Sequence, residues 1–458
     1  MKQFLALILA AGEGTRFKSE KIKVLHTLMG KSMLQLVLDN VLRLRPQRVS
    51  VVVGCQREKV REEISSKKVG FVFQRKQSGT AHAVMAAREV LKKEKEKDLL
   101  VVNADLPLLR PETLRPFLRL HQKKKNALTF LTAELENPTG FGRIYRQGGS
   151  IKRVVEEREA TASQRRLKEV NAGVYLFKVR DLLQALPKVS NQNRKKEYYL
   201  TDTIEILIDQ KKKVESYKTS HPEEIIGVNS RYELAQAVNV LRERKIRSLT
   251  EEGVTVYDPS TTWIDLDVKI GRDTILYSSV IIEGKSVIGN QCVIYPFVHI
   301  LRSRIGNRVK ILGSTMIEES SVQDQVQLGP FTHLRPKTVI QKGAKVGNFV
   351  EMKSTTFGKF SKAGHLSYLG DTQVKDKVNI GAGTITCNYD GVRKYRTVIE
   401  TGAFIGSGTE LVAPVKIGKN AYIGAGSTVT KDVAPESLAV SRSRQVEKKN
   451  WARKKRKK

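Results

Sequence analysis

The sequence has few cysteines, and none of them lies near another. Its three cysteines, Cys55, Cys292 and Cys387, show no C-x-x-C spacing, which excludes a disulfide framework and the usual thiolate zinc site. A reducing compartment is therefore expected, and we predict the cytoplasm. Long apolar runs are also missing, because the longest, Phe4 to Ala11, is far shorter than the roughly 20 residues of a membrane-spanning helix. Gly12 follows this run without a cleavage site, so we expect no signal peptide.

Acidic residues are scarce relative to basic ones. The 458 residues include 47 Asp and Glu against 82 Lys and Arg, which gives a formal net charge of +35. Residues 1–250 carry +22 of this charge and residues 442–458 carry +9. Such a field attracts phosphate, nucleic acid and anionic lipid alike, so charge does not choose among these partners. The length predicts two or three domains, and a hydrophobic content of 40% is enough to give them folded cores.

The first half of the chain alternates apolar runs with amphipathic stretches. Strands are predicted at Leu5–Leu9, Val49–Val53, Phe71–Phe73 and Leu99–Val102, and helices at Met33–Arg45 and Ala81–Lys95. This β-α-β order predicts a largely parallel sheet, in which ligands bind at the carboxyl ends of the strands. Gly12–Arg16 and Asn103–Pro107 follow two of these strand ends.

The second half of the chain repeats an aliphatic residue followed by glycine. Nine such pairs, from Ile270-Gly271 to Ile423-Gly424, recur largely at intervals near multiples of six. Hexapeptide repeats of this kind predict a parallel β-helix with the aliphatic side chains in a shared core. The long interval from Gly381 to Gly406 predicts a protruding loop. Because an open β-helix leaves strand edges and ends exposed, we also expect self-association.

A glycine-rich turn follows the first predicted strand, with the sequence Leu9-Ala10-Ala11-Gly12-Glu13-Gly14-Thr15-Arg16. Such a turn lets backbone N–H groups approach a phosphate or a base closely. Phe17 stands where G-x-G-x-x-G needs its third glycine, and no G-K-[ST] follows, so neither the dinucleotide motif nor the P-loop is present. By itself the turn is equally consistent with ordinary loop structure.

Two groups of motifs carry a resemblance to a known family. The octapeptide above and Lys23-Val24-Leu25-His26 resemble the signature of sugar-phosphate nucleotidyltransferases. The second group consists of Leu334-Arg335-Pro336, Glu351-Met352-Lys353, Lys362-Ala363-Gly364-His365-Leu366-Ser367-Tyr368, Asn379-Ile380-Gly381-Ala382-Gly383-Thr384 and Asn388-Tyr389-Asp390-Gly391. With the repeats, the chain resembles from end to end the bifunctional N-acetylglucosamine-1-phosphate uridyltransferase and glucosamine-1-phosphate N-acetyltransferase family of bacterial envelope synthesis.

The resemblance implies an α/β fold. We expect a Rossmann-like nucleotidyltransferase domain at residues 1–229, a linking helix at 230–250, a left-handed β-helix acetyltransferase domain at 251–441 and a basic tail at 442–458. The implied enzyme acetylates glucosamine 1-phosphate with acetyl-CoA. It then transfers a uridylyl group from UTP to the product and releases pyrophosphate. The implied assembly is a homotrimer, with the acetyl site built between neighbouring subunits.

The resemblance assigns residues to the nucleotide site. Arg16 and Lys23 match the triphosphate-binding positions, where cations are needed because two anions must meet. Asp105 and Asn229 match the magnesium ligands, and oxygen donors suit that ion. The other implied positions are Leu9, Ala10, Ala11 and Gly12 in the turn, Gln74, Gly79 and Thr80 for uracil, and Gly142, Glu156 and Asn171 for the sugar.

The resemblance also assigns residues to the acetyl site. His365 matches the general base, because a histidine titrates near neutrality and can remove a proton from an amine, although an isolated histidine is more often structural. Arg335 and Lys353 match positions that hold the sugar phosphate. The other implied positions are Tyr368 and Asn379 for the sugar, and Ala382, Asn388, Tyr389, Ser407, Ala425 and Arg442 for acetyl-CoA.

Two positions depart from the pattern common in the family. Ile22 stands where a proline often precedes the lysine, and Ala104 stands where a glycine often precedes the magnesium aspartate. We expect the added methyl group of Ala104 to hinder close approach of the nucleotide, which would affect the efficiency of the reaction more than its type.

The chain ends in a basic tail, and two other functions stay open beside the implied one. Residues 448–458 contain eight basic residues and Trp451, a run that is usually a solvated, mobile end. Weak contact with an anionic membrane, at about 1 kcal/mol per residue near the surface, is the second interpretation. No specific nucleic-acid partner is expected. The other functions are a nucleotidyltransferase for another sugar phosphate with a purely structural β-helix, and a non-catalytic regulatory scaffold that binds RNA.

Overall fold

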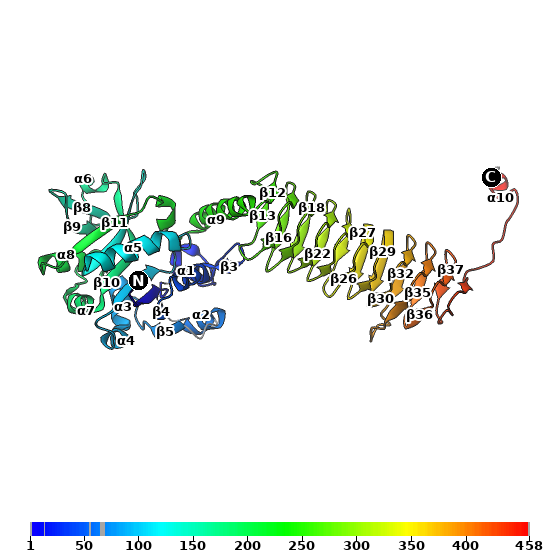
Figure 1. The fold of residues 1–458 in the computed structure, drawn as a ribbon, viewed down its shortest axis with the longest axis horizontal. Helices are drawn as coiled ribbons and strands as arrows, with labels where there is room; N and C mark the ends of the chain where they lie inside the picture. Colours follow the sequence, from blue (N-terminus) through cyan, green and yellow to red (C-terminus); the bar gives the residue numbers. More distant parts are fainter. Residues whose placement is uncertain (1, 13, 55, 65–68, 457–458) are drawn as a thin grey trace. The chain divides into compact units, whose positions relative to one another are not determined.

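A computed structural model describes residues 2–12, 14–54, 56–64 and 69–456 of the chain (Figure 1). Glu13 of the glycine-rich turn, Cys55 and the last two residues of the basic tail lie outside the described residues. The chain forms two compact units, Met1–Leu241 and Arg242–Lys458. The division falls inside helix α9 (Arg231–Glu251).

The first unit is built on a sheet with nine strands in its described part. The order of the main path is β11 (Val214–Lys218), β7 (Leu128–Glu134), β10 (Glu169–Lys178), β6 (Asp98–Asn103), β1 (Phe4–Leu9), β4 (Arg48–Val53) and β5 (Val69–Phe73). The remaining two strands, β8 (Arg143–Gln147) and β9 (Ser150–Val155), form a hairpin beside β10. β6, β1, β4 and β5 are mutually parallel, as predicted, whereas β10 is antiparallel to both β6 and β7.

Helices cover the sheet of the first unit. The helices of this unit that precede α9 are α1 (Met33–Leu42), α2 (Arg57–Glu63), α3 (Thr80–Ala86), α4 (Arg88–Lys92), α5 (Pro111–Lys124), α6 (Ala162–Arg165), α7 (Val179–Ala185) and α8 (Asp202–Asp209). The single helix predicted at Ala81–Lys95 is wrong in one respect, because Ala87 leaves the helical region (φ −86°, ψ 2°) and separates α3 from α4. The helix predicted from Met33 ends early because Arg45, with φ 58°, precedes Pro46.

Both faces of this sheet are buried, as a parallel sheet between helices requires. Alternate residues of β1 enter different cores: Phe4, Ala6 and Ile8 pack with residues of α1 and α5, whereas Leu5 and Leu7 pack with residues of α3, α7 and α8. The carboxyl ends of β1, β4 and β6 meet at one edge of the sheet. Side chains and turns that follow these strands are thereby brought together.

The second unit is a stack of short strands in which every pairing between named strands is parallel (Figure 1). For example, β15 (Ile275–Leu276) pairs with β18 (Val293–Ile294), which pairs with β21 (Lys310–Ile311), so equivalent residues recur every 17 or 18 positions. The aliphatic residues of the repeats form one continuous buried core. This is the predicted parallel β-helix.

The strands that carry the second group of motifs lie in the middle of this stack. They are β25 (His333–Leu334), β27 (Lys345–Lys353), β29 (Lys362–Gly370) and β31 (Asn379–Ile380), and β32 (Ile385–Cys387), β33 (Thr397–Ile399) and β34 (Phe404–Ile405) follow them. The loop predicted before Gly406 is confirmed, because the chain between β32 and β33 leaves the stack and its ends are joined by the bridge between Tyr389 and Lys394.

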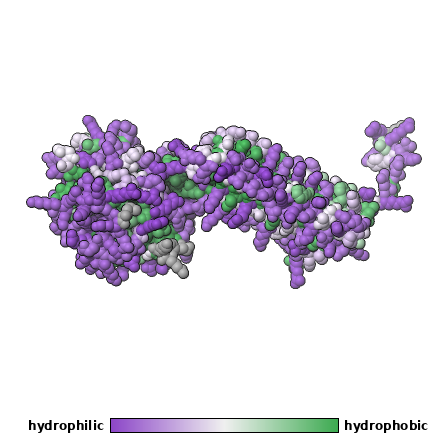
Figure 2. Space-filling view, viewed as in Figure 1, coloured by the Kyte–Doolittle hydropathy of each residue, from purple (hydrophilic) through white to green (hydrophobic). Residues whose placement is uncertain are grey.

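The surface reflects the charge of the sequence, since hydrophilic residues cover most of the face of the first unit seen in Figure 2. Apolar residues also reach the surface at several places on the second unit (Figure 2). Among the helices within the described ranges, none has both the length and the apolar composition needed to cross a membrane.

Candidate active sites

A cavity of about 610 Å³ opens at the carboxyl ends of β1 and β6. Nine of the residues predicted for the nucleotide site line it: Leu9, Ala10, Ala11, Gly12, Lys23, Gln74, Gly79, Thr80 and Asp105. The lining also includes residues that were not predicted, namely Gly14, Thr15, Val24, Lys76, Gln77, Ala83, Asn103 and Glu197. The turn and the two strand ends therefore form one pocket, as their places in the sequence indicated.

Three residues that are distant in sequence meet at this cavity. The Lys23 ammonium donates hydrogen bonds to Asp105 Oδ2 at 2.6 Å and to Asn229 Oδ1 at 3.1 Å, and the whole Lys23 residue is only 9% exposed. Asn229 is itself fixed at the start of α9, because its backbone N–H donates to Glu233 Oε2 at 2.7 Å. A carboxylate and an amide oxygen thus converge on one cation. These are hard donors of the kind that Mg²⁺ prefers, so the pair fits that ion.

The second glycine of the turn makes room for this lysine. Gly14 has φ 64°, and a Cβ atom there would lie 2.5 Å from Lys23 Cβ. The conformation and the close approach both require glycine. Arg16 is exposed in the short 3₁₀ helix Thr15–Phe17 that follows directly.

The residues predicted to recognise uracil lie at another wall of the cavity. The buried Gln74 amide contacts His82 Nδ1 at 2.9 Å. Gly79 has φ 105°, and a Cβ atom would lie 2.5 Å from the carbonyl oxygen of Tyr198. Thr80 Oγ1 accepts a hydrogen bond from Leu200 N at 3.0 Å. Tyr198 and Leu200 therefore contact the residues that form this wall of the cavity.

The three residues predicted to bind the sugar lie together, beside the residues that line the cavity rather than among them. Asn171 N donates to the carbonyl oxygen of Gly142 at 2.9 Å, and a Cβ atom on Gly142 would lie 3.6 Å from the Glu156 carboxylate. Glu156 accepts a hydrogen bond from Thr201 at 2.9 Å, and burial raises its pKa. Burial and the charge of Glu156 also raise the pKa of Asp202 to about 6.

The two departures from the family pattern lie outside the cavity lining. Ala104 is 1% exposed and belongs to the hydrophobic core beneath the cavity, whereas its neighbours Asn103 and Asp105 face the cavity. The expectation that its methyl group hinders the nucleotide is therefore wrong, because that methyl group points into the core. Ile22 packs against the same core.

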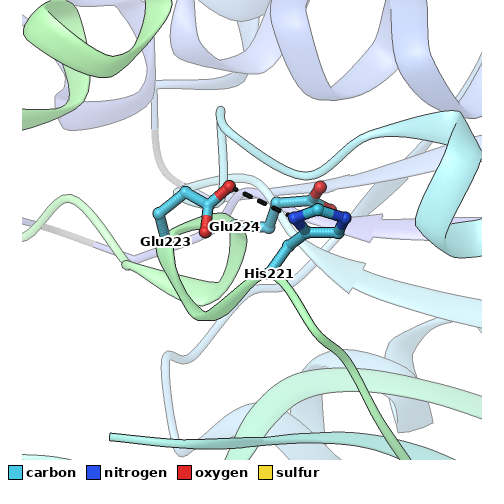
Figure 3. Close-up of side chains that lie close together, drawn as sticks. All are labelled: His221, Glu223 and Glu224. Carbon is cyan, nitrogen blue, oxygen red and sulfur yellow. Dashed lines mark ion pairs between the residues drawn. The ribbon is translucent and has the colours of Figure 1, made fainter. Parts of the chain in front are cut away.

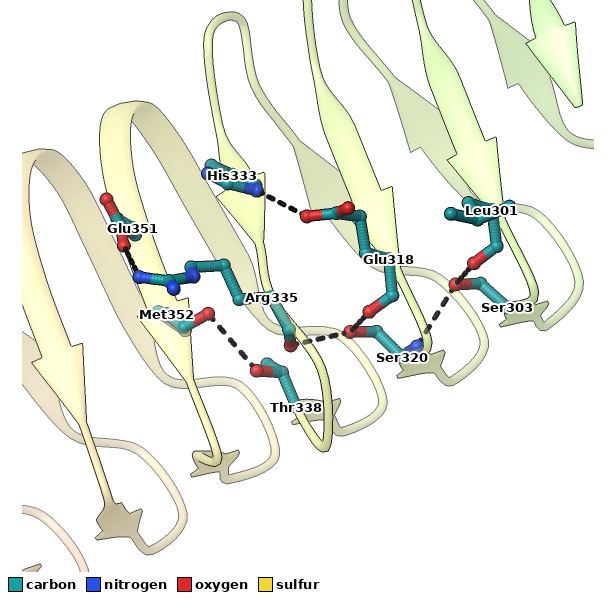
Figure 4. Close-up of polar contacts among 9 residues, drawn as sticks. All are labelled: Leu301, Ser303, Glu318, Ser320, His333, Arg335, Thr338, Glu351 and Met352. Carbon is teal, nitrogen blue, oxygen red and sulfur yellow. Dashed lines mark hydrogen bonds and ion pairs between the residues drawn. The ribbon is translucent and has the colours of Figure 1, made fainter. Parts of the chain in front are cut away.

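The β-helix brings the predicted phosphate-binding residues onto adjacent coils. Arg335 follows β25 and donates to Glu351 Oε1 at 2.8 Å, with the two side chains facing each other in Figure 4. The nearby ammonium of Lys394 lowers the pKa of Lys353, and the charge of Arg335 adds to this effect. Three cations therefore share one place on the surface, which favours binding of a phosphate dianion. Lys394 was not predicted, because only the loop after β32 brings it here.

His365 and Tyr368 both lie on β29, opposite Asn348 and Glu351 of β27. The His365 ring is exposed, and its Nδ1 atom lies 2.7 Å from Asn348 Oδ1. The Tyr368 side chain lies near the Arg335 guanidinium. Asn348 was missed by sequence reasoning, although its distance of 17 residues from His365 equals one coil.

The residues predicted for the coenzyme lie in two places. The Asn388 amide donates to Asp371 Oδ2 at 2.6 Å, and the Tyr389 hydroxyl donates to the Gly391 carbonyl at 2.5 Å in the protruding loop. Asn379, which was predicted to contact the sugar, pairs with Lys362 across β29 and β31. The other residues predicted for the coenzyme, Ala382, Ser407, Ala425 and Arg442, form a column on successive coils. Gly408 N donates to Ala382 O at 2.7 Å, Gly426 N donates to Ser407 O at 2.8 Å, and Arg442 Nη1 donates to Ala425 O at 2.7 Å.

One further group of potential metal ligands occurs within the described residues, namely His221, Glu223 and Glu224 (Figure 3). Glu224 is buried, and both of its carboxylate oxygens accept hydrogen bonds from Arg110. We therefore interpret this group as an internal ion pair that anchors the segment before α9.

Comparison with known proteins agrees with this architecture. Residues 5–266 match the nucleotidyl transferase family, and residues 396–431 match the bacterial transferase hexapeptide family, described as six repeats. The fold and its two sites thus define a nucleotidyl transferase joined to a hexapeptide-repeat transferase.

Relatives named "Bifunctional protein GlmU" align with nearly the whole chain. Those from Geobacillus sp. (strain WCH70) and Thermotoga maritima are both 46% identical, covering 97% and 99% of this chain and 97% and 99% of their own lengths. That from Acetivibrio thermocellus is 43% identical over 99% of this chain and 98% of its own length. The chain belongs to this family of bifunctional GlmU proteins. It is an enzyme with uridyltransferase and acetyltransferase activities, which confirms the predicted function over the two alternatives.

Proposed function

We propose that the protein makes UDP-N-acetylglucosamine in two steps: acetyl transfer from acetyl-CoA to glucosamine 1-phosphate, then uridylyl transfer from UTP to the acetylated product. One observation carries this proposal. Two separate sites each place cationic side chains beside the polar groups that one step needs, one cation in the first site and several in the second. Lys23 lies with Asp105 and Asn229, and Lys353 lies with Arg335 beside the strand of His365.

In the acetyl step, the amine of glucosamine 1-phosphate attacks the carbonyl carbon of the thioester. A C–N bond forms, the C–S bond breaks, and the amine proton passes to His365 and then to the departing sulfur. The products are the N-acetylated sugar phosphate and the coenzyme thiol. Arg335 and Lys353 hold the phosphate, Tyr368 and Asn379 contact the sugar, and Ser407 donates a hydrogen bond near the thioester oxygen. Ala382, Asn388, Tyr389, Ala425 and Arg442 lie along the coenzyme.

In the uridylyl step, a phosphate oxygen of N-acetylglucosamine 1-phosphate attacks the α-phosphorus of UTP. A P–O bond forms and the bond to the pyrophosphate group breaks, so pyrophosphate leaves without a net proton transfer. Lys23 and Arg16 offset the charge of the triphosphate. Asp105 and Asn229 are the residues that would hold magnesium, which when bound neutralises phosphate charge.

The remaining residues of the nucleotide site orient its substrates. Residues 9–12 approach the nucleotide through their backbone, and Gln74, Gly79 and Thr80 recognise uracil. Gly142, Glu156 and Asn171 bind the sugar. Two observations support these assignments. The backbone-binding residues and the uracil-binding residues line the same 610 Å³ cavity. The sugar-binding residues are connected to it because Thr201 bonds to Glu156 and its neighbour Leu200 bonds to Thr80.

We propose the homotrimer that the family resemblance implies, and one corner of the β-helix supports self-association. Phe297, Phe331, Phe349 and Leu366 lie at this corner on different coils, have φ between 46° and 62°, and are 51–68% exposed. The rings of Phe331 and Phe349 stack with their centroids 5.1 Å apart. Large apolar residues are costly both in a left-handed conformation and in water, and contact with another copy offsets the second cost. The corner adjoins His365, so a neighbouring copy would complete the acetyl site.

The reactions are assigned to the cytoplasm, where UTP and acetyl-CoA are made and where free thiols such as those of Cys292 and Cys387 persist. The basic tail includes the short helix α10 (Trp451–Lys455), and its described residues are exposed. Our second interpretation of this tail, weak contact with anionic lipid, stays a prediction.

A coupled assay that records thiol and pyrophosphate separately tests the proposal. Purified protein should release thiol from acetyl-CoA with glucosamine 1-phosphate, and pyrophosphate from UTP with N-acetylglucosamine 1-phosphate and magnesium. His365→Ala should lower thiol release by about 10²- to 10⁴-fold and leave pyrophosphate release unchanged. Thiol release at the wild-type rate in this variant would overturn the assignment of the base.

A further inference from the structure

The imidazole of His365 is held from one side by a neutral side chain. Strands β27 and β29 pair in a register that places Asn348 opposite His365, and Asn348 Oδ1 lies 2.7 Å from Nδ1 of the ring. Because an amide oxygen only accepts hydrogen bonds, this contact requires the proton of the neutral ring to be on Nδ1. The lone pair of Nε2 is then directed away from Asn348 and is available to a substrate.

The hydrogen bond between His365 and Asn348 contributes little to the stability of the fold. The His365 side chain is exposed and Asn348 is only half-buried, and neither belongs to the hydrophobic core of the β-helix. A hydrogen bond between two such side chains competes with water and stabilises a protein only slightly.

The charged groups on β27 and β29 nearest to the pair in register lie three positions away from it. Three positions before the pair, Lys345 of β27 lies opposite Lys362 of β29, and three positions after it, Glu351 lies opposite Tyr368. Glu351 is engaged by Arg335, and β31 contributes only an amide and an aliphatic side chain. The partner that the structure gives to Nδ1 is therefore an amide and not a carboxylate.

We propose that Asn348 is a positioning residue of the acetyl transfer, which fixes the His365 tautomer with Nε2 free and keeps the ring oriented without adding a negative charge. This inference rests on the proposed role of His365 as the base. A carboxylate at position 348 would hold the same tautomer and would also stabilise the charged imidazolium. An apolar side chain of similar size would do neither.

Two variants of Asn348 separate these effects. Asn348→Leu should lower kcat for thiol release about tenfold or more, with the KM for both acetyl-transfer substrates within about twofold of wild type. Asn348→Asp should recover most of kcat at alkaline pH, and should move the acid limb of the kcat/KM profile for thiol release upward by about one pH unit. Pyrophosphate release and thermal unfolding should stay unchanged in both variants.

Asn290→Leu is the matched control, because Asn290 is an exposed asparagine on a distant coil. It should leave both activities at the wild-type level. If His365→Ala keeps thiol release, the proposed base is wrong and this inference falls with it. If His365→Ala is inactive while both Asn348 variants keep the kcat and pH profile of wild type, the inference alone is overturned.

Discussion

The two proposed active sites of this protein are assembled in different ways. The nucleotide site joins Lys23, Asp105 and Asn229, which come from three separate parts of the chain: the 3₁₀ helix Lys23–Leu25, the end of β6 and the start of α9. The acetyl site places its residues at equivalent positions of successive coils, as Asn348 and His365 show. The first site depends on contacts between residues that are distant in sequence, and the second depends on the register between neighbouring coils of the β-helix.

The two sites also differ in how enclosed they are. Lys23 and Gln74 are buried at the wall of a cavity formed within one unit, whereas His365 is exposed on the outside of a coil. An enclosed pocket can exclude water by itself, but an open column of side chains needs a second surface. The comparison therefore predicts that one activity resides in a single chain and that the other requires the assembly.

The largest expected effect is confined to the first site. Asp105→Ala removes a carboxylate that converges with Asn229 on the cation position, so pyrophosphate release should fall by about 10³-fold or more. Thiol release should remain at the wild-type rate, because the two sites share no residue. Measuring both products from the same preparation checks this prediction, and equal loss of both would show that the sites are not separate.

The next effect should be confined to the second site. Phe331→Glu puts a charge at the exposed apolar corner of the β-helix, so it should weaken the association of subunits. At low protein concentration, thiol release should then fall at least tenfold while pyrophosphate release is kept.

Phe360→Glu is the matched control for this variant. Phe360 is similarly exposed, at 52% against 51%, and has a similar φ of 58°, but the neighbouring coils place Arg308, Gln325 and Gly343 at its corner instead of a column of large apolar residues. Light scattering gives the subunit number for both variants. A Phe331→Glu protein that is dissociated and still releases thiol at the wild-type rate would refute the dependence of this site on assembly.

A smaller effect is expected from the shape of the first cavity. Gly79→Ala places a methyl group 2.5 Å from the Tyr198 carbonyl at a φ of 105°, so the backbone between Gln74 and Thr80 must shift. We expect the kcat/KM for UTP to fall about tenfold to a hundredfold with thiol release unchanged. Gly12→Ala is the contrasting variant, because a Cβ atom there meets nothing within 4 Å, and it should cost less.

The sequence predicted what depends on local pattern. Strand ends, the glycine-rich turn, the repeats and the loop before Gly406 all have signals within a few residues. The reversal of β10, the place of Lys394 and the pairing of Asp371 with Asn388 depend on contacts across the fold, and no local signal marks them. Ala104 shows the same limit, because only the structure shows that its methyl group enters the core.

The smallest effect concerns the stability of the first unit. Asp202 has a pKa raised by burial to about 6, above the value of 3.8 for the free side chain, so the folded state loses stability as the pH rises through this window. Asp202→Asn removes this cost, which is about 3 kcal/mol for a pKa raised by about two, but it also removes a negative charge from the first turn of α8. At pH 7 it should therefore raise the free energy of unfolding by about 1–2 kcal/mol. The difference should vanish below about pH 4. Urea unfolding at several pH values measures it, and a gain that is independent of pH would contradict the assignment.

The comparison of the two sites is tested most directly by dilution of the wild-type enzyme through the concentration at which it dissociates. Both products are measured per mole of chain, and subunit number is recorded at each concentration. We predict that pyrophosphate release per chain stays constant while thiol release falls together with the trimer. Thiol release that stays constant in the dissociated chain, or pyrophosphate release that falls with it, would contradict the account.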